Sequence, residues 1–134
     1  MLSSNCSSRV MEEVLKVGGF STNETSIAVV DGAITTEQLA IRNFLLQVCD
    51  SLTNEVNSTD VLPKKLQAPF LKELNKLRRH IEEIQSVKLF AERQKSAFSI
   101  LYVYSLPFAE ELKNKIFNYQ CSDFYRNTIR SLAA

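Results

Sequence analysis

Histidine is the side chain that most often transfers protons at neutral pH, and this chain of 134 residues has one, His80. His80 follows Arg78 and Arg79, whose charge favours the neutral imidazole, and precedes Glu82 and Glu83, which favour the charged form. No second histidine completes a catalytic or metal-binding pair. We therefore expect His80 to be an ordinary residue on a helix.

Six of the fifteen acidic side chains form three adjacent pairs, Glu12-Glu13, Glu82-Glu83 and Glu110-Glu111, which is a poor arrangement for a metal ion. Neighbouring residues of a helix point about 100° apart, and helical two-metal sites use Glu-x-x-His motifs that this chain lacks. The phosphate-binding patterns GxxxxGK[ST] and GxGxxG and the nucleophile pattern GxSxG are also absent. The sequence therefore predicts no catalytic residue, no cofactor, no metal and no enzymatic activity.

The three cysteines, Cys6, Cys49 and Cys121, are far apart and form no CxxC pair. This pattern is typical of free thiols in a reducing compartment, so we expect an intracellular (cytoplasmic or nuclear) protein. One disulfide with a spare thiol is the alternative. The first twenty residues show no signal peptide, and the longest apolar run, Ile100–Tyr104, is too short to span a bilayer. A secreted chain whose leader had been removed would look the same, so secretion stays open.

Basic residues cluster in the middle of the chain. Residues 64–95 carry nine basic and four acidic groups, whereas residues 1–63 carry three basic and eight acidic groups. Lys72, Lys76 and Arg79 recur at helical spacing and form a stripe. Such a stripe can be a solvated face, can bind a nucleic acid, or can recognise an acidic protein partner. The acidic first half can instead lie against the basic middle within one fold, which is the interpretation we favour.

Aromatic residues are dense in the last third of the chain. Tyrosine is common at interfaces because it has an apolar body and a polar tip. We therefore predict that four tyrosines contact a partner: Tyr102, Tyr104, Tyr119 and Tyr125.

Only three glycines and three prolines occur, which is too few for the turns of a sandwich or barrel and favours helices. The clearest helical pattern is a 4-3-4-3 spacing of apolar residues that must bury a seam. Its members are Phe70, Leu74, Leu77, Ile81 and Ile84. The sequence predicts an all-α bundle of about five to seven helices, with a long central helix starting near Pro69. That helix either passes thirty residues or breaks near Gln85–Ser86.

Local signals define the other helices. Thr35-Thr36-Glu37-Gln38 is a capping box that opens a helix to about Asn54. Leu106-Pro107 ends the helix that contains Ile100–Tyr104, and Ser122 caps a last helix to Leu132. Further expected helices cover Arg9–Val17, Phe108–Tyr119 and the segment after Ser21, where Ile27–Val30 is a strand in the rival interpretation. The inward residues of the last helix are expected to be Phe124, Tyr125, Ile129 and Leu132. We expect residues 1–134 to form one domain, with residues 1–8 loosely ordered.

These observations predict a helical protein–protein interaction module, an adaptor or a subunit of a larger complex. Self-association through the Phe70–Ile84 seam is one form of this function, because a 4-3 seam can pair between chains. The alternative is a helical domain that binds nucleic acid through the basic stripe within Lys64–Lys95. The sequence leaves the partner and the oligomeric state open.

Overall fold

The computed structural model describes residues 32–132, and five α-helices account for 82% of them. The helices are α2 (Thr36–Ser58), α3 (Lys64–Glu82), α4 (Val87–Ser105), α5 (Glu110–Cys121) and α6 (Asp123–Leu132). The described residues contain no strand, only an isolated bridge between Ala33 and Ser86. The predicted all-α bundle is confirmed. The expectations for the residues before 32 lie outside the described part of the chain.

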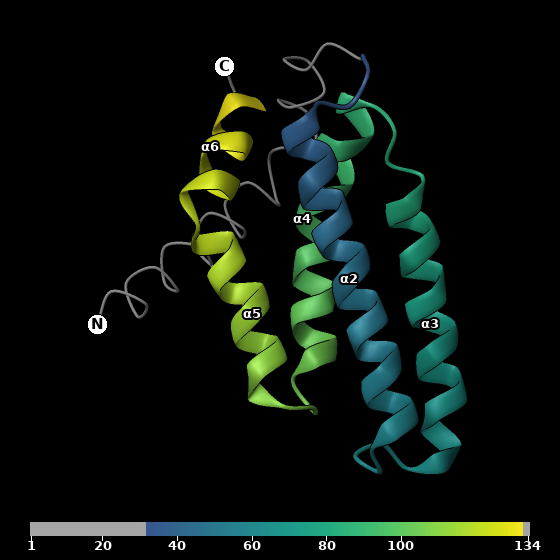
Figure 1. Cartoon of the computed structure of the whole chain (residues 1–134). Helices are drawn as coiled ribbons and strands as arrows, with labels where there is room; N and C mark the ends of the chain where they lie inside the picture. The colour runs from purple at the N-terminus through teal and green to yellow at the C-terminus, as the bar shows by residue number, and fades with distance from the viewer. Residues whose placement is uncertain (1–31, 133–134) are drawn as a thin grey trace.

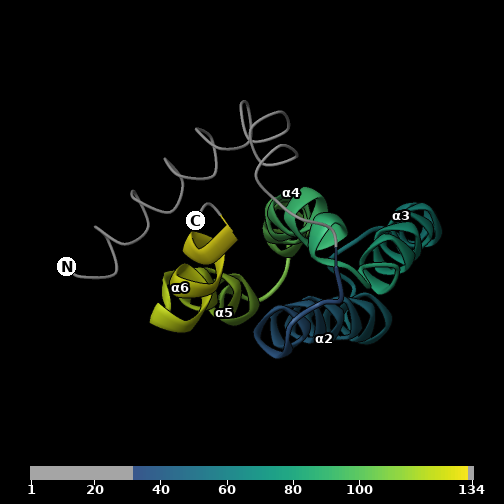
Figure 2. The ribbon, with the colours of Figure 1, turned by 90° about the horizontal axis from the view of Figure 1, so that it is seen from above.

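Helix α2 is the centre of the described fold, because it packs against each of the other four helices. Figure 1 shows α2, α3 and α4 running side by side, with α5 and α6 along the other flank of α2. Seen from above in Figure 2, α3 and α4 lie next to each other on one side of α2. The bundle therefore has α2 in common between an α3–α4 pair and an α5–α6 pair.

Side-chain caps determine where three helices begin. The Thr35 hydroxyl accepts a hydrogen bond from the Gln38 N–H at 3.1 Å, and Gln38 Oε1 accepts one from the Thr35 N–H, which is the predicted capping box. Ser86 caps α4 through the Leu89 N–H, and Ser122 caps α6 through the Tyr125 N–H. Each cap satisfies backbone donors that have no partner inside the helix.

The expected long helix differs from the structure at its start, and of the two alternatives for its end the structure has the break near Gln85–Ser86. Helix α3 begins at Lys64 rather than near Pro69, with Pro63 as its N-cap residue and Pro69 inside it. Pro69 is still near the start of α3, where its missing N–H removes one intrahelical bond. The chain leaves the helix after Glu82, and Ser86 then opens α4. Two helices of 19 residues thus replace one long helix.

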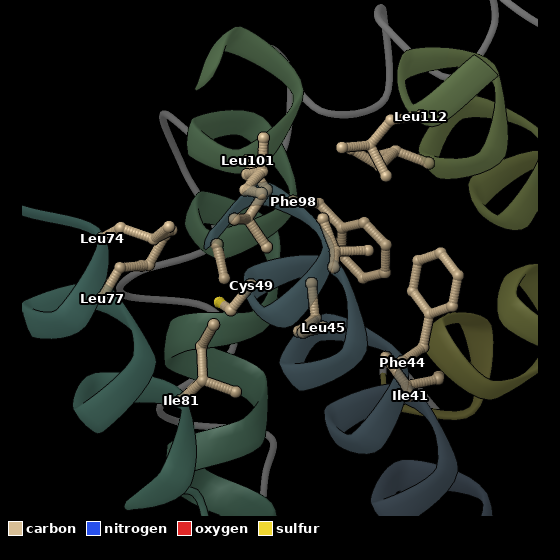
Figure 3. Packing of buried hydrophobic residues seen from close by; sticks show 14 of the residues in the cluster. Ile41, Phe44, Leu45, Cys49, Leu74, Leu77, Ile81, Phe98, Leu101 and Leu112 are labelled. Atoms are coloured by element: carbon tan, nitrogen blue, oxygen red, sulfur yellow. The ribbon is translucent and has the colours of Figure 1, made fainter. Parts of the chain in front are cut away.

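The predicted 4-3 seam is buried inside the chain. Leu74, Leu77 and Ile81 of α3 point toward Leu45 and Cys49 of α2 in Figure 3. Ile84 is also fully buried, and Phe70 is partly buried at the open end of the seam. Because these side chains are already packed, they are not available to pair with a second copy of the chain.

Aromatic rings join α2, α4, α5 and α6. Phe44 stacks on Tyr119 with ring centroids 3.8 Å apart, and Phe98 meets Tyr125 edge-on at 4.9 Å. The Tyr125 hydroxyl donates to Gln94 Oε1 at 2.7 Å within the core. The inward position of Tyr125 is as predicted, whereas Phe124 is 43% exposed and its predicted inward position is wrong.

Ion pairs link some of the oppositely charged segments. Arg78 of α3 pairs with Asp50 of α2, and also with Glu82 one turn further along α3 at 3.6 Å. Arg93 of α4 donates to Glu83 at 2.9 Å. Part of the basic middle therefore pairs within the fold.

Two leucines of α3 differ in burial and provide a matched test of the core. Leu74 is 1% exposed and Leu66 is 47% exposed. We expect Leu74→Ala to lower the free energy of unfolding by about 2–5 kcal/mol, because it leaves a cavity against α2. Leu66→Ala should cost less than about 1 kcal/mol. Urea unfolding followed by circular dichroism measures both, and equal losses would contradict the packing of α3.

Candidate functional site

The predicted basic stripe is exposed on α3. Lys72, Lys76 and Arg79 all face solvent, and Lys76 pairs with Glu73 at 3.3 Å. Within the part of the chain that the structure describes, no ion pair involves Lys72, Arg79 or the earlier Lys65. These three cations therefore keep their charge uncompensated at the surface.

The four predicted tyrosines do not form one surface. Tyr102 packs on Phe117 of α5 at 5.3 Å between ring centroids, whereas Tyr104 lies 5.2 Å from Phe70 of α3. Both are partly buried and lie on different sides of α4.

Tyr119 and Tyr125 belong to the aromatic core described above. Burial raises the pKa of the Tyr119 hydroxyl, and Tyr125 is 6% exposed. Their interpretation as partner-binding residues has no support in this arrangement, because their rings are engaged inside the chain. Tyr104 is the tyrosine that borders an open surface.

His80 is exposed on α3, and its surroundings favour the neutral imidazole. Desolvation lowers the pKa of His80, the charge of Arg93 lowers it further, and Glu83 acts in the opposite direction. The backbone carbonyl of His80 accepts a hydrogen bond from Arg93 at 2.8 Å. His80 thus helps to join α3 to α4 through its backbone.

The two cysteines of the described residues differ. Cys49 is a free thiol buried between α2 and α3, and desolvation raises its pKa to about 12 against the lowering effect of Arg78. Cys121 is disulfide-bonded, so the expectation of free cysteines is wrong for that residue. Disulfides are typical of oxidising compartments, so the cysteines no longer favour an intracellular location. A thiol with so high a pKa is protonated at neutral pH and is a poor nucleophile or metal ligand.

Residues 32–132 contain neither a metal-binding cluster nor a candidate membrane-spanning helix. No group of three or more His, Cys, Asp or Glu side chains there is arranged to hold a metal ion. Among the helices described, none combines the length and the hydropathy that a membrane crossing requires.

An open apolar groove lies where α3 begins and α4 ends. These two helix ends are at the lower end of the bundle in Figure 1. The hollow has a volume of about 320 Å³. We define the α3–α4 groove by its lining residues, which are Leu62, Leu66, Pro69, Phe70, Glu73 and Tyr104. Glu73 is the one charged residue among them, and it pairs with Lys76. An apolar hollow of this kind is a typical place for another molecule to bind.

Exposed apolar residues continue from the groove. The described residues contain six large hydrophobic side chains that are strongly exposed, and five of them belong to the start of α3 or the end of α4. These five are Val61, Leu66, Ile100, Val103 and Leu106. Phe124 of α6 is the sixth. Clustered exposure of this kind marks interaction surfaces in soluble proteins, whereas isolated exposed residues need no explanation.

The groove was not predicted from the sequence, although a signal for part of it exists. In the run Ile100–Tyr104 every residue is apolar or aromatic, and successive residues of a helix point about 100° apart. The run therefore cannot face the core with all its members, so some must be exposed. Leu66 was missed for another reason, because the segment between Pro63 and Pro69 reads as a short turn.

The chain was compared with protein-family models, with curated proteins and with solved structures, and none of these comparisons found a match.

The raised pKa of Cys49 predicts a loss of stability in alkali. The unfolded thiol loses its proton near pH 9, whereas the folded thiol keeps it to about pH 12. In that window the unfolded state binds fewer protons, so the free energy of unfolding falls by about 1.4 kcal/mol per pH unit.

Urea unfolding at several pH values between 8 and 11 measures this loss. Cys49→Ala lowers stability at every pH because it removes buried volume, but it should remove this part of the pH dependence. Parallel curves for both proteins would contradict a protonated, buried Cys49.

Proposed function

We propose that this protein is a protein–protein interaction module whose binding surface is the α3–α4 groove. It acts as an adaptor or as a subunit of a larger complex, without catalysis of its own. The observation that carries this proposal is an apolar hollow of about 320 Å³ whose lining includes the exposed Leu66, with further exposed apolar residues close to its lining in the sequence. Binding would remove this surface from water, at about 25 cal/mol per Å² of apolar area.

The fold supports a rigid role for this surface. Phe70, which lines the groove, also contacts Tyr104 and Phe108 at 5.2 and 5.9 Å between ring centroids. Phe108 is buried, and helix α3 is held on α2 by its buried seam. A groove whose floor is continuous with the core loses little conformational freedom on binding, which favours affinity.

A nucleic-acid-binding domain is the second candidate, favoured by the uncompensated charges of Lys65, Lys72 and Arg79. Phosphate backbones attract such a row, and affinity would fall steeply with salt. This candidate leaves the apolar groove without a role. The protein-interaction proposal uses the groove and the neighbouring charges together.

Affinity capture from a lysate of the source cells tests the proposal. The tagged full chain is incubated with and without nuclease, and bound proteins are quantified by mass spectrometry. We expect a partner that resists nuclease and whose yield falls at least about tenfold in Leu66→Glu and Pro69→Glu, because a charge in the groove opposes apolar contact.

Phe124→Glu is the matched control, since Phe124 is similarly exposed but lies on α6. It should leave the yield unchanged. Thermal unfolding of each variant verifies that the fold is retained. Capture that nuclease abolishes would favour the nucleic-acid candidate, and capture that survives both groove substitutions would contradict the groove as the binding surface.

A further inference from the structure

The α3–α4 groove has one basic and one uncharged side. On α3, Lys65 directly precedes Leu66 and Lys72 directly precedes Glu73, so each lies about 100° around the helix from a groove residue. Lys65, Lys72, Lys76 and Arg79 recur at spacings of 7, 4 and 3 and form a row that we call the basic rim. Lys65 and Lys72 lie beside the groove, and Lys76 and Arg79 continue the rim beyond Glu73 along the exposed side of α3.

The basic rim keeps most of its charge. Lys65, Lys72 and Arg79 are exposed, and no ion pair within the described residues neutralises them. Lys76 forms an ion pair with Glu73, which partly neutralises its charge. Asp60 precedes Val61 near the start of α3 and is the other acidic residue beside this end of the groove. The α3 side of the groove is therefore net positive.

The α4 side of the groove is uncharged. The second half of α4, from Ser96 to Ser105, contains no acidic or basic residue. Ile100 lies four residues before the lining residue Tyr104, so it continues the apolar surface along the same side of α4. A bound partner thus meets positive charge on one flank and apolar side chains on the other.

From this asymmetry we infer that the α3–α4 groove binds an amphipathic α-helix whose apolar face fills the hollow and whose acidic flank lies along the basic rim. The inference rests on the proposed function and names the chemistry of its partner. A space beside two packed helices is filled by a third helix through ridges and grooves, and such partners use anchors at i, i+3, i+4 and i+7. The lining residues of α3, from Leu66 to Glu73, span about 10 Å, or about two helical turns.

Designed peptides test this inference directly. Three fluorescent helical peptides of about four turns carry leucines at i, i+4 and i+7 and differ on one flank, which is glutamate, glutamine or lysine. Fluorescence anisotropy measures their binding to the full chain at low and at physiological salt. We expect the glutamate peptide to bind at least about tenfold more tightly than the lysine peptide, with the difference shrinking as salt rises.

Two substitutions assign the two parts of the site. Leu66→Glu should abolish binding of all three peptides, with Pro69→Glu as the second groove variant. The double variant Lys65→Glu/Lys72→Glu should reverse the order of the glutamate and lysine peptides, whereas Lys115→Glu on α5 should not change it. A reversal of preference is a gain of binding, so partial unfolding does not explain it.

Three results would each overturn the inference. They are equal affinities for the glutamate and lysine peptides, binding that survives both groove variants, and no binding of any peptide. If the peptides fail while Leu66→Glu still removes a nuclease-resistant partner from the lysate capture, the proposed function stands and its occupant has another chemistry. If no peptide binds and the lysate capture also finds no partner that depends on Leu66, the groove is not a binding surface.

Discussion

The burial of α2 is the constraint on which the other described helices depend. Its buried side chains recur at Ile41, Leu45, Val48, Cys49 and Leu52, and none of these is more than 1% exposed. On a second side, Phe44 stacks with Tyr119 of α5 and approaches Phe98 of α4. Because α2 supports both helix pairs, weakening its packing would loosen the α3–α4 pair and the α5–α6 pair together.

This arrangement explains why an apolar groove remains open. Helices α3 and α4 each direct a buried stripe toward α2 and pack less extensively on each other. Side chains at the margin of these stripes, such as Leu66 and Ile100, then lie on the outer side, where no described helix covers them. The groove thus remains because α3 and α4 both pack on α2, and no described helix covers their outer side.

Short-range signals in the sequence predicted much of the fold. Three of these signals depend on residues that are near each other in the sequence, and the structure has all three. They are the Thr35–Gln38 capping box, the Ser122 cap and the 4-3 seam from Leu74 to Ile84. The end of α3 depends on contacts between distant residues. Val87 N–H bonds the Gly32 carbonyl at 2.9 Å, and Arg93 joins α4 to Glu83, so the link after Glu82 is stabilised from elsewhere in the chain. No local glycine or proline marks that break.

The candidate site could be predicted only in part, because a row of charges shows its position on a helix but not which charges the fold neutralises. In the sequence, the nine basic residues from Lys64 to Lys95 form one basic segment, and nothing distinguishes those that bind a partner from those that pair within the fold. In the structure Arg78 and Arg93 pair with Asp50 and Glu83. Their role is to join helices.

What remains beside the groove is a shorter row in which Lys65, Lys72 and Arg79 have no acidic partner. Exposed charges of this kind contribute less to affinity than to the rate and orientation of binding. The apolar groove would therefore supply most of the binding energy, and the lysines beside it would decide which helices can enter and in which direction.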